Sequence, residues 1–420
     1  MFQYKDTHRM AQMAIRQFMD KEIRPHVIHH ENHPEDPPYP LMKKLLTTFG
    51  VTSMAESAFQ KMKKREAAKA AGEAGDDAEK KGGSMLGGND PAMSSILGIE
   101  LARVCPGIAL SFGATLGLYG QSIMNKGTLW QKEKYGLPIF KMEKIGAWGM
   151  TEPGAGSDAY GSMRTTARRD GDWWVLNGHK TFITNAPFAD YFVIYAKIDE
   201  GQGVSRDTPI QAFIVEKGTP GFEASKPFRK MGMHSSPTGE VFLDNVKIPL
   251  NQLLGEKAKE QAKEQSRDVF SSERTGTATM CLGIIDRCCE LTFKYMRERE
   301  QFGQKIGDFQ GLRWMLADML TIRENVKNWH LRMLDYQVRG ERVPMEIACA
   351  DKLYCAPAAT KVAMDAVQIM GGFGYMQDAE VEMHARDAKL IEIGGGTNQI
   401  QQNTIAREVM RTGQIPPLYA

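Results

Sequence analysis

The sequence predicts an α+β fold, in which a helical N-terminal domain is followed by a middle antiparallel β domain and a C-terminal helical bundle. Three observations predict it. Apolar residues recur at helical spacing in the first third of the chain, short β-branched and aromatic runs between turn residues fill the middle, and long helical patterns return in the last third. We expect domains over 1–145, 146–250 and 251–420.

The N-terminal domain shows helical spacing over 5–24, over 40–50 and, in broken form, over 94–126. Residues 63–90, KKREAAKAAGEAGDDAEKKGGSMLGGND, contain almost no large apolar side chain. Because such a segment cannot bury enough apolar surface to form a core, we expect an exposed insertion of helix and loop near 61–90.

Turn residues divide the middle of the chain into short strands such as YFVIYAKI, IQAFIVEKG and GEVFLDNVKIP. Asp170-Gly171 and Asn177-Gly178 predict two hairpin turns, because both residues of a type I′ turn need positive φ. The helical patterns that follow cover roughly 266–299, 310–337, 344–370 and 399–411 and predict a bundle.

Composition disfavours several classes of function. With 53 Lys and Arg against 51 Asp and Glu, the chain offers no charge excess for a nucleic acid. The stretch MFQYKDTHRMAQMAIRQF lacks the apolar core of a signal peptide, and the longest weakly apolar run, 107–120, is too short to span a bilayer. The six cysteines form no Cys-x-x-Cys pair and fall mostly in helix-like apolar stretches, which favours buried thiols and a reducing, cytoplasmic location.

GAGSDA, residues 154–159, formally matches the Gly-x-Gly-x-x-Ala dinucleotide fingerprint. That fingerprint has meaning only between a strand and a helix, where the helix N-terminus meets the pyrophosphate. Here strands and hairpin signals follow it, so we reject a nicotinamide-binding site.

A histidine cluster could hold a metal, because His26, His29, His30 and His33 include two pairs at i,i+4 spacing. The four prolines around them disfavour a helix, and no carboxylate or cysteine set completes a site. We expect a solvated loop and no metal.

Three further motifs are ambiguous when taken singly. REREQFGQ, residues 297–304, is typical of a helix C-terminus capped by Gly303. GGFGY (371–375) and GGGTNQ (394–399) are not Walker loops, since no Gly-Lys-Ser/Thr follows. Bare backbone beside Gln368 or Gln399 suits hydrogen bonding to a flat polar ring or to phosphates, and two helix-ending turns explain it equally well.

Together these motifs resemble one family, the flavin-dependent acyl-CoA dehydrogenases. The shared motifs occur in the family's order and spacing over nearly the whole chain: TEPGAGSDA at 151–159, NGHKTFITN at 177–185, KMGMHSSPT at 230–238, REREQFGQ, DAVQIMGGFGY at 365–375 and GGGTNQIQQNTIAR at 394–407. The resemblance implies a C-terminal four-helix bundle, a homotetramer, and FAD between the β domain and the bundle, held partly by a neighbouring subunit.

The resemblance also implies site residues. The positions that line the isoalloxazine ring and its polar edge are Trp148, Met150, Thr151, Gly156, Ser157, Phe182, Ile183 and Thr184. Those that reach the pyrophosphate or adenosine across a subunit boundary are Arg299, Gln301 and Gln310, and the remaining flavin contacts are Gln368, Gly371, Gly372, Thr397 and Gln399. The substrate-binding candidates are Ser157, Arg274, Gly395 and Gly396.

The reaction that the resemblance implies is α,β-dehydrogenation of an acyl-CoA thioester, as in β-oxidation of fatty acids or degradation of aromatic acids. A carboxylate removes the α-proton, the β-hydride passes to the flavin, and a hydrogen-bonded thioester oxygen carries the enolate-like charge. An electron-transfer flavoprotein then takes the electrons.

The carboxylate that most relatives carry just before the Gly-Thr of the last motif is missing, because Gly395 stands there. Glu392 lies three residues earlier and would need a backbone shift to reach the substrate. Members that resemble isovaleryl-CoA and long-chain acyl-CoA dehydrogenases carry the base on a bundle helix, where FSSERTGTATMCLG, residues 270–283, supplies Glu273. We predict Glu273 as the base, with Arg274 binding or orienting the substrate; a Glu favoured in a first helical turn by the helix dipole is the alternative.

Two other departures concern the substrate. His234 stands where relatives often have Arg, and residues 61–90 replace the short loop over the substrate entrance. Since Gly395 leaves space beside the α-carbon, the sequence favours a branched, cyclic or aromatic acyl group. The alternatives are a flavin oxidase or monooxygenase of the same fold and a catalytically silent subunit of a hetero-oligomeric dehydrogenase.

Overall fold

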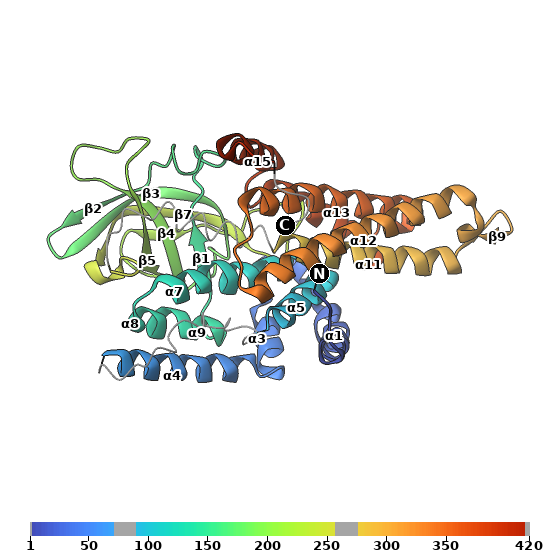
Figure 1. The fold of residues 1–420 in the computed structure, drawn as a ribbon, viewed down its shortest axis with the longest axis horizontal. Helices are drawn as coiled ribbons and strands as arrows, with labels where there is room; N and C mark the ends of the chain where they lie inside the picture. The colour runs from blue at the N-terminus through green and yellow to red at the C-terminus, as the bar shows by residue number, and fades with distance from the viewer. Residues whose placement is uncertain (1, 71–89, 257–275, 416–420) are drawn as a thin grey trace.

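The computed structural model describes residues 2–70, 90–256 and 276–415. The strands gather at one end of an elongated molecule, and long helices run from the middle to the other end (Figure 1). The order along the chain is helices, sheet, helices, so the predicted α+β fold is confirmed.

The N-terminal helices form over the three stretches with helical spacing, and further helical turns form over residues 27–32 and 129–140, which lie outside those stretches. They are α1 (Asp6–Phe18), α2 (Val27–Asn32), α3 (Tyr39–Thr48), α4 (Val51–Ala70), α5 (Pro91–Val104), α6 (Pro106–Phe112), α7 (Gln121–Lys126), α8 (Leu129–Gln131) and α9 (Leu137–Phe140), with π-helical turns at Met19–Ile23, Gly113–Gly120 and Lys132–Gly136. The Asp90 side chain caps α5 by accepting a 3.0 Å hydrogen bond from the Ala92 N–H. Pro106 opens α6, which places the expected break of the 94–126 pattern at Cys105.

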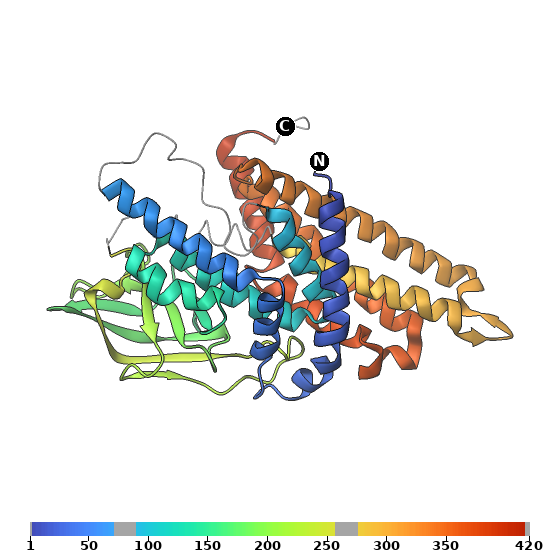
Figure 2. The same cartoon turned by 90° about the horizontal axis from the view of Figure 1, so that it is seen from below.

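Helix α4 runs from the core into the segment expected as an insertion (Figure 2). Val51, Ala55 and Phe59 are buried at helical spacing, whereas no residue from 60 to 68 is buried. The second half of α4 is therefore exposed, as its composition predicts. Residues 71–89 lie outside the described part of the chain, so the rest of the insertion near 61–90 stays a prediction.

The middle of the chain forms a single curled seven-stranded sheet in the order β1-β4-β2-β3-β7-β6, with β5 beside β4. The strands are β1 (Gly146–Gly149), β2 (Thr166–Asp170), β3 (Trp173–Thr184), β4 (Tyr191–Ile198), β5 (Ile210–Glu216), β6 (Phe222–Ala224) and β7 (Thr238–Pro249). Most neighbours are antiparallel, as predicted, but β4 runs parallel to both β1 and β2.

One of the two predicted hairpins forms, although Asp170 lacks the positive φ of the expected type I′ turn, and the other predicted hairpin is wrong. Asp170 pairs with Trp173 around a tight turn in which Gly171 has φ +57°. Asn177 and Gly178 lie inside β3, where the register against β7 shifts. Gly178 has φ +156°, and a Cβ there would lie 2.4 Å from Thr165 Oγ1, so this glycine serves a bulge and a close approach.

The C-terminal part is a four-helix bundle, as predicted, but its fourth helix is residues 381–393 and not the expected 399–411, which forms a separate helix. The helices are α11 (Thr277–Glu298), α12 (Gln310–Arg339), α13 (Met345–Gly374), α14 (Val381–Ile393) and α15 (Asn398–Thr412), and α11 to α14 share one buried core. Gly303 is not a helix cap, contrary to the prediction: α11 ends at Glu298, and Phe302-Gly303, with φ +54° and +78°, turns the hairpin between β8 (Glu300–Gln301) and β9 (Gln304–Lys305).

A second core joins the N-terminal helices to the sheet, so the sheet packs on helices that precede it in the chain. Among the described helices, none is both long enough and apolar enough to cross a membrane.

Candidate functional site

Two segments predicted to line the flavin lie side by side in the β domain: residues 148–151, at and after the end of β1, and residues 182–184, at the end of β3. The Thr181 N–H donates a 3.0 Å hydrogen bond to the Thr151 carbonyl. The Lys180 ammonium donates to the Met150 carbonyl at 3.1 Å. The fold therefore brings these two sets of predicted residues together.

Phe182 is turned outward by the backbone of β3. Its φ is +58° and its side chain is 68% exposed, while the next residue, Ile183, is buried. The register of β3 against β7 shifts between Lys180 and Ile183, which produces this rotation. A bulky residue with positive φ costs about 1–3 kcal/mol of strain, and such residues are found most often at ligand sites.

Trp148, from the neighbouring predicted segment, packs on Tyr195 with ring centroids 5.1 Å apart.

A buried ion pair holds the turn after β1 against β3. Lys180 Nζ lies 2.9 Å from Glu152 Oε1, and the Glu152 carboxylate also accepts the N–H groups of Arg164 and Thr165 at 2.7 and 2.9 Å. Burial lowers the pKa of Lys180 to about 8. Burial alone would raise the pKa of Glu152, but the Lys180 charge and the N–H donors lower it overall. Both ends of the 152–165 segment are thereby fixed.

The GAGSDA motif lies in turns and bends between β1 and β2, and residues 151–165 contain no helix. The dinucleotide fingerprint therefore lacks the helix N-terminus on which it depends, in agreement with the rejection of a nicotinamide site. Gly156 and Ser157 are exposed, and a Cβ at Gly156 would have no atom within 4 Å. The backbone here is open to a ligand.

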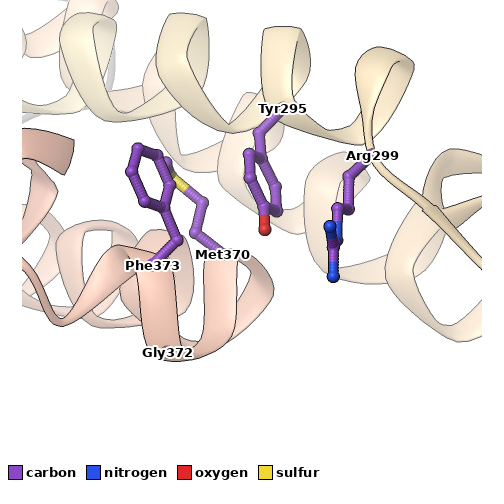
Figure 3. A pocket seen from close by; sticks show the side chains of 5 residues that line it. All are labelled: Tyr295, Arg299, Met370, Gly372 and Phe373. Atoms are coloured by element: carbon purple, nitrogen blue, oxygen red, sulfur yellow. The ribbon is translucent and has the colours of Figure 1, made fainter.

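A pocket of about 470 Å³ lies where α11 and α13 end (Figure 3). Its lining residues are Tyr295, Arg299, Met370, Gly372 and Phe373. Tyr295 and Phe373 stack across it with ring centroids 5.7 Å apart. Within the described residues the Arg299 guanidinium has no hydrogen-bond or ion-pair partner, so its charge is available to an anion.

Bare backbone faces open space beside this pocket. Gly371 interrupts α13 with φ +60° and ψ −139°, a conformation that glycine alone adopts readily. A Cβ at Gly371 or Gly372 would meet nothing within 4 Å. The amide side chains predicted to join them, Gln301, Gln310 and Gln368, are exposed at the same end of the bundle.

The predicted flavin residues are thus divided between two distant places in one chain. Figures 1 and 2 both show the β8–β9 hairpin, which separates Arg299 from Gln310, at the opposite end of the molecule from the sheet that carries Phe182. A single chain does not bring these two groups together.

The glycine stretch that precedes α15 forms the third group. Gly395 and Gly396 have φ +62° and +88°, and Thr397 caps α15 by accepting from the Ile400 N–H at 3.3 Å. Gln399 is exposed. Glu392, at the end of α14, accepts hydrogen bonds from Thr360 Oγ1 at 2.7 Å and Lys389 Nζ at 3.0 Å.

The predicted base Glu273 and its neighbour Arg274 lie outside the described residues, which resume at Gly276. Their assignment stays a prediction. The next described helix in the chain, α11, begins at Thr277.

His234 belongs to a polar cluster that links α2, the 230–238 segment and α14. Its Nδ1 lies 3.6 Å from Glu31 Oε2, and its Nε2 lies 2.8 Å from the Lys230 carbonyl oxygen. Arg386 also approaches Glu31, at 3.5 Å. Burial and the Glu31 charge raise the pKa of the adjacent Asp387 to about 8. The cluster joins three parts of the chain, which sequence motifs alone did not reveal.

The histidine cluster is helical, contrary to the expected loop, because α2 spans Val27–Asn32. His29 Nε2 lies 2.8 Å from Asp36 Oδ2, and His30 Nδ1 lies 2.8 Å from the Asp36 carbonyl oxygen. Ligand atoms of these three residues fall within 4.8 Å of one another. The contacts close the turn after α2, and Asp36 is the carboxylate that the sequence analysis did not associate with these histidines.

Comparison with known proteins places these observations in a family. The family model described as acyl-CoA dehydrogenase, middle domain, matches residues 147–246, and the one described as acyl-CoA dehydrogenase, C-terminal domain, matches residues 264–410. The short-chain specific acyl-CoA dehydrogenase of Clostridium acetobutylicum is 37% identical over 326 residues, 77% of this chain and 84% of that protein. The chain belongs to the acyl-CoA dehydrogenase family.

Two other proteins extend the comparison. The caffeyl-CoA reductase-Etf complex subunit CarC of Acetobacterium woodii is 36% identical over 329 residues, 78% of this chain and 85% of that protein. The structure of butyryl-CoA dehydrogenase from Megasphaera elsdenii superimposes with a TM-score of 0.82 at 31% identity, covering 98% of this chain and 100% of that one. This acyl-CoA dehydrogenase is accordingly an FAD-dependent oxidoreductase.

The residues present fit FAD. The outward Phe182 ring offers an apolar surface to a planar ring. The Arg299 guanidinium, which has no partner among the described residues, lies beside bare glycine backbone and suits a pyrophosphate. The sequence did not reveal Lys352 and Gln401, whose side chains hold the turn at Gly395 and Gly396 (the glycine turn). Lys352 contacts a carbonyl 40 residues further along the chain, and no local pattern marks such a residue.

Proposed function

We propose that this enzyme dehydrogenates an acyl-CoA at its α,β-bond with Glu273 as the base, and that the acyl group is branched, cyclic or aromatic. The observation that supports Glu273 is that the alternative carboxylate, Glu392, is hydrogen-bonded and has a lowered pKa. Partial burial opposes ionisation of Glu392, but the hydrogen bonds from Thr360 and Lys389 lower its pKa overall. A base for a weak carbon acid needs the opposite shift and a free oxygen.

The proposed chemistry assigns a role to each part of the site. Glu273 takes the α-proton, and Arg274 orients the substrate. Backbone N–H groups of the glycine turn, at Gly395 and Gly396, stabilise the charge on the thioester oxygen, and Ser157 lies at the substrate side of the flavin edge. The bound FAD supplies the acceptor for the β-hydride.

We propose that one FAD is held by two subunits of a homotetramer. One subunit would hold the isoalloxazine ring with Trp148, Met150, Thr151, Gly156, Ser157, Phe182, Ile183 and Thr184 and would contact the flavin with Thr397 and Gln399. The neighbouring subunit would supply Arg299, Gln301, Gln310, Gln368, Gly371 and Gly372. The separation of these groups within one chain supports this. So do three exposed aromatic side chains at the bundle end, Phe302 (93%), Trp314 (62%) and Tyr375 (76%), which an adjacent subunit would cover.

The substrate class rests on the missing side chain at Gly395, which leaves space beside the α-carbon. The relative named as a caffeyl-CoA reductase subunit is consistent with an aromatic acyl group, and its Etf complex is consistent with an electron-transfer flavoprotein as acceptor. We further propose the boundaries 1–145, 146–250 and 251–420 for the three domains, and a cytoplasmic location.

Anaerobic flavin bleaching tests the proposal. Purified protein is mixed without oxygen with butyryl-, isovaleryl-, cyclohexanecarbonyl- and 3-phenylpropionyl-CoA, and absorbance near the flavin maximum is followed. We expect bleaching, fastest with one of the last three. No bleaching by any thioester would contradict acyl-CoA dehydrogenation.

The same preparation separates the two alternatives. Rapid peroxide formation in air with little reduction of an electron-transfer flavoprotein indicates an oxidase. Light scattering that detects an inactive homomer, which gains activity only on mixing with a second chain, indicates a silent subunit. A dehydrogenase gives neither result.

A further inference from the structure

Two buried side chains engage the carbonyl groups of Gly395 and Gly396, and one of them also engages that of Glu392. Lys352 Nζ, on α13, donates to the carbonyl oxygens of Glu392 and Gly396 and to Asn398 Oδ1, each at 2.9 Å. Gln401 Nε2, on α15, donates to the carbonyl oxygens of Gly395 and Gly396 at 3.1 and 2.8 Å. Lys352 is 1% exposed and Gln401 fully buried.

The backbone N–H groups of the same turn are not used in hydrogen bonds between the described residues. Within the described residues, the backbone N–H groups of Gly395 and Gly396 donate to no protein acceptor. Both glycines have positive φ, a conformation that a β-carbon would strain. Gly395 and Gly396 are half-buried, so their N–H groups are accessible while the carbonyl groups on the other side of the turn are held by side chains.

The two side chains do more than fill space. An ammonium group has three N–H donors, and the three contacts of Lys352 fix the turn from one side. Because a carbonyl and the following N–H belong to one conjugated amide, the bond from Gln401 to the Gly395 carbonyl also polarises the Gly396 N–H. The contacts of Lys352 orient the turn, and the bond from Gln401 makes the Gly396 N–H a stronger hydrogen-bond donor.

The residue before Lys352 contacts the other half of the proposed site. Asp351 is fully buried, and its carboxylate faces the Ala278 N–H in the first turn of α11. Successive residues of α13 therefore contact both the glycine turn and the helix that follows Glu273 in sequence.

We propose that Lys352 and Gln401 are positioning residues, which hold the glycine turn so that the N–H groups of Gly395 and Gly396 face the thioester oxygen of the acyl-CoA. The inference rests on the proposed function, because it assigns these donors to the enolate-like charge. Neither side chain touches the substrate in this account.

The test measures proton removal apart from hydride transfer. The holoenzyme is reduced with dithionite so that the flavin cannot accept a hydride, and the acyl-CoA of the panel that bleaches fastest is incubated at saturating concentration in D₂O. Mass spectrometry then gives the rate of α-deuterium incorporation. Loss of an oriented oxyanion donor reduces such rates by about 100-fold, so we expect at least a tenfold loss for Gln401→Met, which keeps the side-chain volume.

Gln131→Met is the matched control. Gln131 is also fully buried and donates to two backbone carbonyls, those of Asn251 and Leu253, at 2.7 and 2.9 Å, but it lies between α8 and the segment after β7. We expect both variants to lose similar thermal stability and only Gln401→Met to lose exchange. Equal exchange in Gln401→Met and wild type, at equal FAD content, overturns the inference.

A second variant decides the question where Gln401→Met does not fold. Asn398→Ala removes one acceptor of Lys352 at a partly exposed position, and we expect exchange to fall about threefold. Wild-type exchange in Asn398→Ala then overturns the inference. Wild-type enzyme that neither exchanges nor bleaches contradicts the proposed function itself, which is a separate result.

Discussion

Thr360 Oγ1 on α13 donates a 2.7 Å hydrogen bond to Glu392 Oε1 on α14, and Lys389 Nζ lies 3.0 Å from the other carboxylate oxygen. The carboxylate nearest in sequence to the expected position of the base is therefore held by its own bundle. We expect Glu392→Gln to bleach the flavin within about threefold of the wild-type rate, because a general base contributes about 100-fold or more when removed. Stopped-flow absorbance measures this, and a loss above 100-fold would identify Glu392 as the base.

Removal of the Arg299 guanidinium is expected to weaken FAD binding. A charge-assisted hydrogen bond to phosphate is worth about 1.5–3 kcal/mol, so Arg299→Ala should raise the dissociation constant of FAD by about 10- to 100-fold. The ratio of flavin to protein absorbance after gel filtration reports it. Arg297→Ala is the control, since Arg297 is exposed near the same helix end and lies over the Phe293 ring.

Mixed oligomers test whether Arg299 acts across subunits. If it does, co-expression of Arg299→Ala and Glu273→Gln chains creates some sites with an intact base from one chain and an intact guanidinium from the other. We expect these hybrids to recover activity that neither variant has alone. Absence of any recovery in hybrids isolated by two affinity tags would place Arg299 and Glu273 in the same site of the same chain.

Acid stability depends on His330, a buried residue of α12. Tyr4 Oη and Ser95 Oγ lie 2.9 and 3.0 Å from His330 Nε2, and burial lowers the pKa of His330 to about 4. Its ordinary pKa is about 6.5, so between these values the unfolded chain binds more protons at this site and stability falls as the pH drops.

The replacement His330→Gln should remove this acid sensitivity. Between pH 6.5 and 4.5 we expect the wild type to lose about 2 kcal/mol more than the variant, although the variant starts lower because its hydrogen bonds change. Urea unfolding at both pH values measures the difference. The exposed His26→Gln serves as control, and parallel losses in wild type and His330→Gln would contradict the buried neutral histidine.

Gly178 should tolerate no β-carbon. The clash with Thr165 and the unusual φ predict a loss of about 3 kcal/mol for Gly178→Ala. Gly171 has positive φ as well, but a Cβ there meets nothing within 4 Å, so Gly171→Ala should lose about 1 kcal/mol. Denaturant midpoints compare the two, and equal losses would show that the close approach to Thr165 is unimportant.

The order of helices, sheet and helices was predictable because apolar periodicity reports which face of a helix or strand is buried. Two helices were not predicted: α2 lies where a loop was expected, and α14 takes the place in the bundle that was expected for 399–411. Local turn chemistry was less informative. Asn177-Gly178 has the composition of a hairpin, yet the partner strand β7 and Thr165 determine that it is a bulge. Gly303 likewise suits either a helix cap or a hairpin, and the two-residue pairing of β8 with β9 decides it.

The candidate site was predictable where its residues lie in short motifs. Phe182, Arg299 and Gly371 each have the exposure or backbone conformation that a ligand contact needs. What the sequence could not provide is their distribution over two ends of the chain, or the contact of Lys352 with a turn far along the sequence, because both depend on helix packing.

The base assignment is tested most directly by the rate of anaerobic flavin bleaching in Glu273→Gln, with Glu392→Gln as matched control at equal FAD content. The account predicts a loss of at least about 100-fold in Glu273→Gln and almost none in the control. Bleaching by Glu273→Gln at the wild-type rate would contradict it.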